Sequence, residues 1–306
     1  MTRRLPLALL VLAVPALAGC ATFSNVDRVA TVNGVDITRA EFEAMSQDFF
    51  AHPDLFGAAA PVDGHVDAGA ARDLIAITAQ ARLIRELVGD DELDAAADAA
   101  LEGLAADDPV RDMTPEMQTL FAEITSRQGL LATVPAPDAA ELEQGYTESP
   151  ASVGVLCVRH ILVETEAEAD DVAAQLADGA DFAELAAEVS RDTGSGASGG
   201  VVPSPSGGAC WTLSDALGGA GLVPEFVHNA RPLAAGETSA PFATDFGWHI
   251  VQQLPWSDVA DSVVAAHAPG VTGDVQYVAA LLGADVDVDP TFGVWDSGTA
   301  SIVPLG

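Results

Sequence analysis

Residues 153–163 read VGVLCVRHILV, an apolar run rich in β-branched side chains that predicts a buried strand. Two helix N-cap patterns follow, TEAE at 165–168 and DFAE at 181–184. Three further elements come after them: a long Gly/Ser/Pro-rich loop at 191–210, a short helix at 224–230, and paired strands at 239–244 and 248–254. This order predicts an α+β unit of about 100 residues.

Upstream of this unit, residues 38–148 predict helices almost throughout. A small hairpin precedes them, because alternating apolar residues flank the turn-forming pair Asn33-Gly34. A capping box at 38–41 begins a helix that runs to about residue 50. Apolar stripes at helical spacing mark three more helices, over 74–88, 114–129 and 138–146. No His, Cys or acidic cluster has ligand spacing here, so we expect a small helical domain with an apolar groove.

The tail repeats neither pattern. Residues 259–282 contain helical stretches interrupted by Pro269-Gly270, and residues 286–304 predict extended chain. Aspartate alternates with valine at positions 285, 287 and 289, which favours a solvated strand face. A calcium loop is the alternative, but its glycine and terminal glutamate are missing.

Composition limits the function classes. The 306 residues carry 46 acidic and 12 basic side chains, a formal net charge of −34. A nucleic-acid partner requires a basic surface, so none is expected. All 12 bases are arginines, and a chain without lysine forms neither a Walker-type phosphate loop nor a Schiff base. Hydrophobic residues make up 49% of the chain, which permits a buried core, and the length favours about two domains.

The first residues predict an export signal. Arg3 and Arg4 precede an apolar stretch at 5–17, and the segment ends Leu-Ala-Gly-Cys at Cys20. This ending resembles a bacterial lipobox, which implies that Cys20 is lipidated and that acyl chains hold the protein outside the cytoplasmic membrane. An ordinary secretory signal with a cysteine nearby is the alternative.

Four short motifs follow one another in a fixed order between residues 152 and 255. They are Arg159-His160-Ile161-Leu162, then Ser190-Arg191-Asp192 ahead of Gly199-Gly200, then Pro224-Glu225-Phe226, and last Gly247-Trp248-His249-Ile250. The ordered set resembles the parvulin (PpiC-like) family of peptidyl-prolyl isomerases. The resemblance implies a small antiparallel sheet flanked by helices. Residues 32–42 look similar to the N-terminal chaperone domain of SurA-type proteins.

The resemblance implies a site without covalent chemistry. His160 and His249 would form a paired-imidazole platform beneath the rotating bond, and Asp192 would lie near its carbonyl. Three residues would line an apolar cup for proline and one would hydrogen-bond within the histidine network: Val202, Leu222, Phe226 and Thr244. No cofactor is required, because no bond breaks, and no further ligand spacing completes a metal site. A lone strand histidine is more often structural, and Phe226 alone could be core, but the ordered set favours a functional site.

The long loop differs from the family pattern in two ways, and the helix after Phe226 differs as well, with Asn229, Arg231 and Pro232. The family usually has G-G-D-L-G where this chain has GGVVP at 199–203, and the stretch 203–220 is long and rich in glycine. These changes bear on the substrate rim more than on the histidine pair. Four other histidines have no evident partners and are expected to be solvated: His52, His65, His228 and His267.

The two remaining cysteines form an even pair that suits an oxidising compartment. Cys157 precedes His160 by three residues, so on an alternating strand it points to the opposite face. A bridge to Cys210 would therefore pin the far end of the long loop to the first strand without occupying the catalytic face. Two unpaired thiols are the alternative.

These observations predict an α+β fold and an extracytoplasmic, lipid-anchored prolyl isomerase that assists secreted polypeptides containing X-Pro bonds. The alternative is a holdase chaperone whose parvulin-like domain is inactive and only binds Pro-containing or unfolded segments. Four parts are expected along the chain: a signal peptide at 1–19, a helical SurA-like domain at 20–151, a parvulin-like domain at 152–256, and a C-terminal helix with an extended tail at 257–306.

Overall fold

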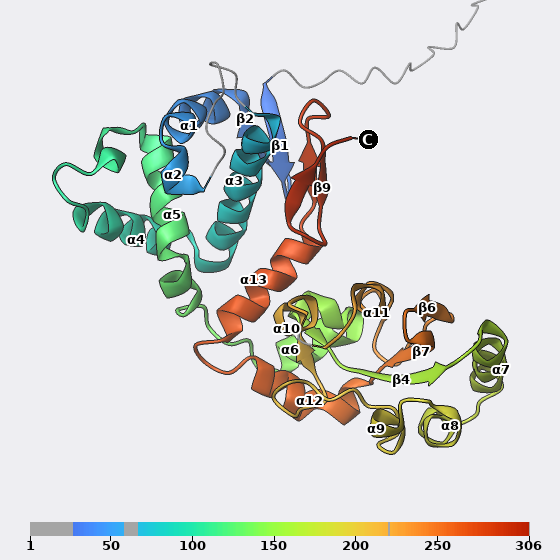
Figure 1. Cartoon of the computed structure of the whole chain (residues 1–306). Helices are drawn as coiled ribbons and strands as arrows, with labels where there is room; N and C mark the ends of the chain where they lie inside the picture. The colour runs from blue at the N-terminus through green and yellow to red at the C-terminus, as the bar shows by residue number, and fades with distance from the viewer. Residues whose placement is uncertain (1–26, 58–66, 220, 306) are drawn as a thin grey trace, which may run out of the picture.

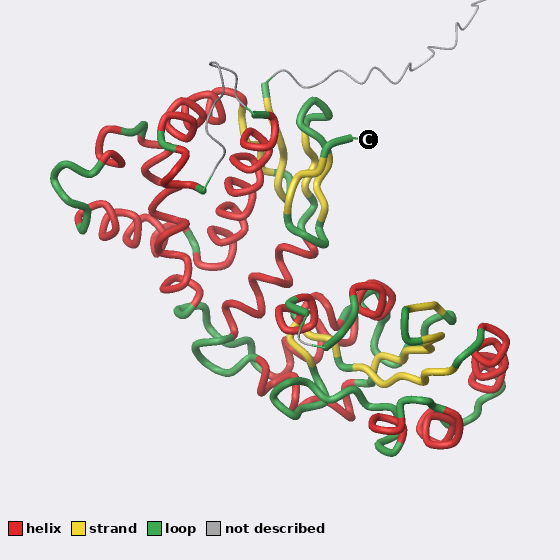
Figure 2. Tube along the Cα trace, in the orientation of Figure 1, coloured by secondary structure: helices red, strands yellow, loops and turns green. Residues whose placement is uncertain are grey.

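The computed structural model describes residues 27–57, 67–219 and 221–305. The predicted signal peptide at 1–19 and the predicted lipidation residue Cys20 lie outside the described residues. Within the described ranges, a helical unit and an α+β unit lie next to each other and are connected by a helix, α13 (Figure 1). Figure 2 shows that most strands gather in the α+β unit and along one side of the helical unit.

The helical unit begins with the predicted hairpin. β1 (Arg28–Val32) pairs antiparallel with β2 (Val35–Thr38). Both turn residues have positive φ, 48° at Asn33 and 83° at Gly34, as a two-residue hairpin turn requires. Thr38 then accepts a hydrogen bond from the Glu41 amide and caps the first helix. The helices described in this unit are α1 (Arg39–Ala51), α2 (Pro53–Phe56), α3 (Ala68–Val88), α4 (Asp90–Glu102) and α5 (Pro115–Leu131), with a 3₁₀ turn at Pro109–Asp112.

The tail returns to this helical unit. β8 (Val286–Val288) pairs antiparallel with β1, so the sheet order is β2-β1-β8. A second hairpin, β9 (Val294–Asp296) with β10 (Ser301–Val303), packs against α3. Figure 1 shows these red strands beside the blue ones. Tail residues such as Val288 and Ile302 are buried in the same core as Leu74 of α3, so the tail completes the helical unit.

The α+β unit lies between these two parts of the sequence. Its antiparallel sheet has the order β4-β7-β6, and a short ladder joins β3 to β5. Its strands are β3 (Val155–Leu156), β4 (Val158–Val163), β5 (Trp211–Thr212), β6 (Phe242–Thr244) and β7 (Gly247–Gln253). Its helices are α6 (Ala139–Glu148), α7 (Glu166–Ala177), α8 (Phe182–Val189), α9 (Thr193–Gly196), α10 (Leu213–Leu217), α11 (Pro224–Ala230) and α12 (Trp256–Ala266), with a 3₁₀ turn at Pro150–Val153. The predicted α+β class, with helices before a small antiparallel sheet, is therefore confirmed.

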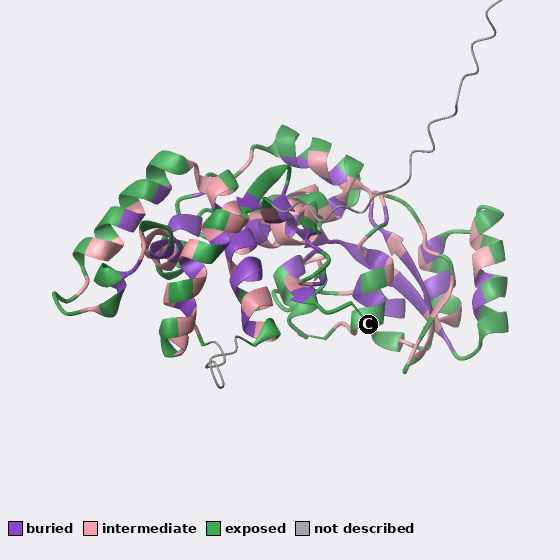
Figure 3. Cartoon of the chain, turned by 90° about the horizontal axis from the view of Figure 1, so that it is seen from above, coloured by how far each residue is buried: buried purple, intermediate pink, exposed green. Residues whose placement is uncertain are grey.

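α13 (Thr272–Gly283) connects the two units (Figure 1). Tyr277 of this helix is buried in the core of the helical unit, whereas Val278 and Leu282 pack against a core of the α+β unit. Figure 3 shows buried residues along the strands and on the inward faces of the helices. The boundaries given above for the four parts of the chain remain a prediction. No pattern in the sequence indicates that the tail pairs with β1.

Several local predictions differ from the structure. The single strand predicted at 153–163 is two strands, because the extended hydrogen-bonded structure is interrupted at Cys157, between β3 and β4. Gly129 does not end α5, because it lacks the positive φ that a glycine C-cap needs, and the helix continues to Leu131. The loop predicted at 191–210 contains the helical turn α9, since Asp192 caps it.

Candidate active site

Strand pairing brings the two predicted histidines together. In the antiparallel register of β4 and β7, His160 lies opposite Val251 and His249 lies opposite Leu162. The histidines therefore occupy diagonal positions on one face of the sheet. Their rings are stacked, with centroids 5.4 Å apart and planes 21° from parallel, and their Nδ1 atoms are 3.2 Å apart. Both side chains are buried.

The long loop supplies the acid. Asp192 caps α9, because its Oδ1 accepts hydrogen bonds from the amides of Gly194 and Ser195. Its Oδ2 is thereby directed at His160, 2.9 Å from Nε2, and it accepts a 2.7 Å hydrogen bond from the Ser195 hydroxyl. The Ser195 Oγ also lies 2.9 Å from His160 Nε2.

A glycine fixes the loop against the strand. The His160 amide donates to the Gly200 carbonyl at 2.8 Å. Gly200 has a φ of 85°, and a Cβ there would lie 2.5 Å from the His160 carbonyl oxygen. Only glycine permits this close approach, so the double glycine in the sequence sets the depth at which the loop meets β4.

Hydrogen bonding assigns the protons along the network. The Asp192 carboxylate is an acceptor, so the Nε2–H of a neutral His160 donates to it, and its Nδ1 accepts from the Nδ1–H of His249. The Nε2 of His249 must then accept from the Thr244 hydroxyl, 2.8 Å away. The Thr244 oxygen in turn accepts from the Phe246 amide. Every donor therefore has an acceptor, with both imidazoles neutral.

The shifted pKa values agree with this arrangement. Burial, with a smaller contribution from His160, lowers the pKa of His249 to about 4. Burial also lowers the pKa of His160, although the Asp192 carboxylate opposes the shift. Burial alone would raise the pKa of Asp192, but hydrogen bonds from Ser195 and His160 outweigh it and lower the pKa to about 2. At neutral pH the site therefore holds two neutral rings beside one carboxylate.

A cup of about 340 Å³ opens above the histidine pair. Phe226 is 3% exposed, and its ring meets both histidine rings edge-on, with centroids 5.6 Å from each. The other lining residues are mostly apolar: Leu162, Val202, Gly221, Leu222, Val223 and Phe246, together with Asp192. The structure therefore brings the predicted lining residues Val202, Leu222 and Phe226 together around the histidines, while Thr244 lies behind His249.

Sequence reasoning missed three residues of the site. Ser195 bonds both His160 and Asp192, and its position three residues after a capping aspartate is the signal that could have found it. Phe242 stacks on His249 with centroids 5.5 Å apart. Phe246 is 66% exposed at the rim of the cup. For neither phenylalanine does the sequence contain a pattern that marks a site residue.

One expectation for the remaining histidines is wrong. His267, expected to be solvated, is 2% exposed and contacts Thr272 Oγ1 at 3.1 Å and the Val153 carbonyl at 2.9 Å. Its carbonyl partner is more than a hundred residues away in sequence, so local patterning could not indicate it. His228 is exposed and His52 is half-buried, while His65 lies outside the described residues.

Cys157 and Cys210 are joined by a disulfide, with Cα atoms 4.1 Å apart. The bridge is buried with Tyr146 and Leu254 in a cluster separate from the one that contains Phe226. It therefore ties the end of the long loop to the first strands behind the cup.

The described residues contain no group of three or more His, Cys, Asp or Glu side chains placed to hold a metal ion. Within the same ranges, no helix combines the length and apolar character that crossing a bilayer requires.

Comparison with known proteins shows that this site is similar to that of a family. Residues 160–253 match the family described as Rotamase, the PPIC-type PPIASE domain. A parvulin-like PPIase of Rickettsia bellii is 44% identical over 97 residues, which cover 32% of this chain and 31% of the relative. The foldase protein PrsA of Caldanaerobacter subterraneus is 38% identical over 112 residues, which cover 37% of this chain and 33% of the relative.

Solved structures that are similar to this chain include a parvuline and a peptidylprolyl isomerase. The solution structure of NmPin, the parvuline of Nitrosopumilus maritimus, is 31% identical and has a TM-score of 0.27, covering 33% of this chain and 96% of that one. The crystal structure of the peptidylprolyl isomerase PrsA from Bacillus anthracis is 20% identical and has a TM-score of 0.28, covering 68% of this chain and 95% of that one.

The matched residues include both histidines, Asp192 and the predicted lining residues of the cup. Residues 160–253 of the chain are thus similar to a parvulin-type rotamase domain. It spans about a third of the length of the curated relatives it matches.

Proposed function

We propose that the α+β unit is an active peptidyl-prolyl cis-trans isomerase. The observation that carries the proposal is the apolar cup built directly on a closed network of two neutral histidines, Asp192, Ser195 and Thr244. A proline ring would enter beside Phe226, and its preceding amide would lie over the histidine rings.

The chemistry follows from the electronic structure of the amide. Rotation about an X-Pro bond is slow, with a barrier of roughly 18–20 kcal/mol, because the planar amide is stabilised by resonance. The twisted amide has less charge separation, so an apolar cup that excludes water favours it over the planar form. Lowering the barrier by about 4–7 kcal/mol corresponds to an acceleration of roughly 10³–10⁵-fold.

The histidines are positioning groups in this scheme. With His249 at a pKa of about 4 and both rings neutral at pH 7, neither imidazole is poised to transfer a proton to the substrate. The rings instead form the floor of the cup, and the hydrogen bonds of Thr244 and Asp192 fix their orientation. Asp192 is the group that would face the rotating carbonyl.

The proposed clients are unfolded or partly folded secreted polypeptides with X-Pro bonds, and the proposed location is extracytoplasmic. The buried disulfide supports an oxidising compartment. The Leu-Ala-Gly-Cys ending at Cys20 supports a lipid anchor. For Cys20→Ala, we expect the protein to leave the membrane fraction of the producing bacterium. Retention of this variant in membranes after a high-salt wash would contradict the lipid anchor without affecting the isomerase proposal.

A holdase chaperone is the second candidate, favoured by the apolar cavity of the helical unit. Two assays on one preparation separate the candidates: NMR exchange on an X-Pro peptide, and suppression of aggregation of an unfolded client. Catalysed exchange supports the isomerase. Suppressed aggregation together with an uncatalysed exchange rate would establish the holdase and overturn the isomerase proposal.

A further inference from the structure

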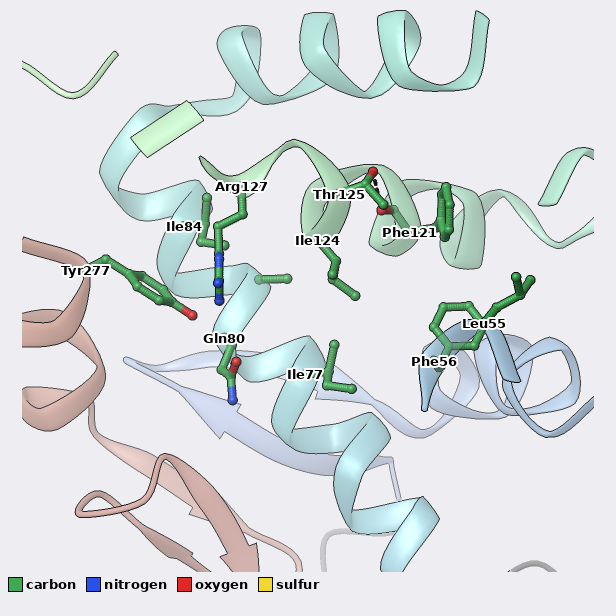
Figure 4. Close-up of a pocket in the computed structure, with 11 residues that line it drawn as sticks. Leu55, Phe56, Ile77, Gln80, Ile84, Phe121, Ile124, Thr125, Arg127 and Tyr277 are labelled. Atoms are coloured by element: carbon green, nitrogen blue, oxygen red, sulfur yellow. Dashed lines mark hydrogen bonds between the residues drawn. The ribbon is translucent and has the colours of Figure 1, made fainter. Parts of the chain in front are cut away.

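A second cavity, of about 200 Å³, lies in the helical unit and not at the histidine cup. Figure 4 shows it between α3 and α5, with residues of α2 at one end and Tyr277 of α13 at the other. Apolar side chains form most of its wall: Leu55, Phe56, Ile77, Ala81, Ile84, Phe121 and Ile124. Leu55 is 45% exposed and Ile124 is 39% exposed, so the wall opens to solvent.

The end of this cavity at Tyr277 is polar. Tyr277 is only 5% exposed, and its hydroxyl, which finds no hydrogen-bond acceptor among the described residues, points into the space between Arg127 and Gln80 (Figure 4). The Arg127 guanidinium lies over the Tyr277 ring, 5.7 Å from the ring centroid. Among the described side chains, no carboxylate pairs with Arg127.

The buried Tyr277 hydroxyl is therefore a donor without an acceptor, and it lies beside the exposed side chain of Arg127. Arginine has hydrogen-bond donors and no acceptor. Arg127 therefore cannot accept a hydrogen bond from the Tyr277 hydroxyl, which still needs an acceptor for its proton. The neighbouring Gln80 amide already donates to the Ala300 carbonyl at 3.0 Å. A buried donor without an acceptor is unfavourable. An anionic acceptor placed between the two residues would accept from the Tyr277 hydroxyl and pair with the Arg127 guanidinium. The chain has 46 acidic residues, but no described Asp or Glu lines this cavity.

We propose that this cavity binds the C-terminal residue of another polypeptide. An apolar last side chain would fill the apolar wall, and its α-carboxylate would accept hydrogen bonds from Tyr277 and Arg127. The volume of about 200 Å³ is below that of pockets for drug-sized ligands, so it suits one side chain better than a long acyl chain. The rest of the polypeptide would leave through the open side at Ile124.

The test uses the full chain and a probe without proline, so that binding does not depend on the histidine cup. The probe is the peptide acetyl-Gly-Ser-Gly-Ser-Phe with a free carboxylate, and its C-terminal amide is the matched ligand. By isothermal titration calorimetry, we expect the acid to bind about tenfold or more tightly than the amide, because charged hydrogen bonds are lost in the amide. Methyl NMR signals of Ile77 and Ile124 should shift on binding and locate the ligand.

Two variants connect the binding to the polar end. Tyr277→Phe and Arg127→Gln should each reduce affinity for the acid towards that for the amide, whereas Arg231→Gln, in the α+β unit, should leave it unchanged. Tyr277→Phe is expected to fold, because it removes a buried hydroxyl without an acceptor. Equal binding of acid and amide, no binding of the acid at millimolar concentration, or no effect of either variant would overturn the proposal. Binding of decanoate but not of the peptide would overturn it in favour of a fatty acid.

Discussion

The Nδ1 atoms of His160 and His249 face each other at 3.2 Å. Because one must donate and the other accept, the two rings hold opposite tautomers: His160 is protonated at Nε2 and His249 at Nδ1. Asp192 fixes the first tautomer and Thr244 the second. The orientation of both rings is therefore set from outside the pair, by a loop residue and a strand residue.

The lowered pKa values predict an acid-sensitive fold. Between about pH 6.5 and pH 4 the unfolded chain binds protons at His160 and His249 that the folded chain does not, so stability falls as the pH falls through this window. Above it, neither group makes stability depend on pH. From pH 7 to pH 5 we expect a loss of about 1–2 kcal/mol from His249, because burial lowers its pKa from 6.5 to about 4.

Urea unfolding at pH 7 and pH 5 measures this loss. His249→Asn should reduce the difference between the two pH values, whereas His228→Ala, at an exposed position, should keep it. A wild-type stability that is the same at both pH values would contradict the neutral assignment of the pair.

Phe226→Ala should weaken proline binding, because the cup loses the ring that contacts both histidines. Phe182→Ala is the matched control, since both phenylalanines are 3% exposed but Phe182 lies in the core on Val172 and Leu185 and away from the cup. Each substitution should cost about 3–5 kcal/mol of stability through the cavity it leaves. Only Phe226→Ala should reduce affinity for an X-Pro peptide, by about tenfold or more, in NMR titrations. An equal loss of affinity in both variants would indicate a general loss of structure.

The disulfide should stabilise the fold without taking part in catalysis. The bridge closes a sequence separation of 53 residues, for which chain entropy gives about 4 kcal/mol at most. The double variant Cys157→Ala/Cys210→Ala should therefore lower the unfolding midpoint while the isomerisation rate of the remaining folded protein is unchanged. An unchanged unfolding midpoint would contradict the stabilising role of the disulfide. Loss of isomerisation activity in the folded variant would contradict its absence from catalysis. Alkylation of the unreduced wild type should leave both cysteines unmodified.

Local patterns predicted the elements whose signals are short-range. The Asn33-Gly34 turn, the Thr38 cap and the helix that begins at Pro224 are all present, because each depends on residues a few positions apart. The pairing of β8 with β1 was not predictable in this way. It joins residues more than 250 positions apart, and only the completed core of the helical unit favours it.

The same distinction between local and long-range signals applies to the residues of the site. The ordered motifs indicated His160, Asp192 and His249, and the structure places them in one hydrogen-bonded network. Ser195 and Phe242 were not indicated, because their roles depend on where a loop and an edge strand lie in three dimensions.

The most direct test of the central claim is the exchange rate of an X-Pro peptide at pH 7, measured by NMR with the full chain present at a small fraction of the peptide concentration. The wild type should accelerate cis-trans exchange by at least about 10³-fold per bound peptide over the uncatalysed rate. His249→Ala should reduce the acceleration strongly, because it removes the stacked ring and the donor to His160 Nδ1. Exchange at the uncatalysed rate with both the wild type and His249→Ala would contradict the account.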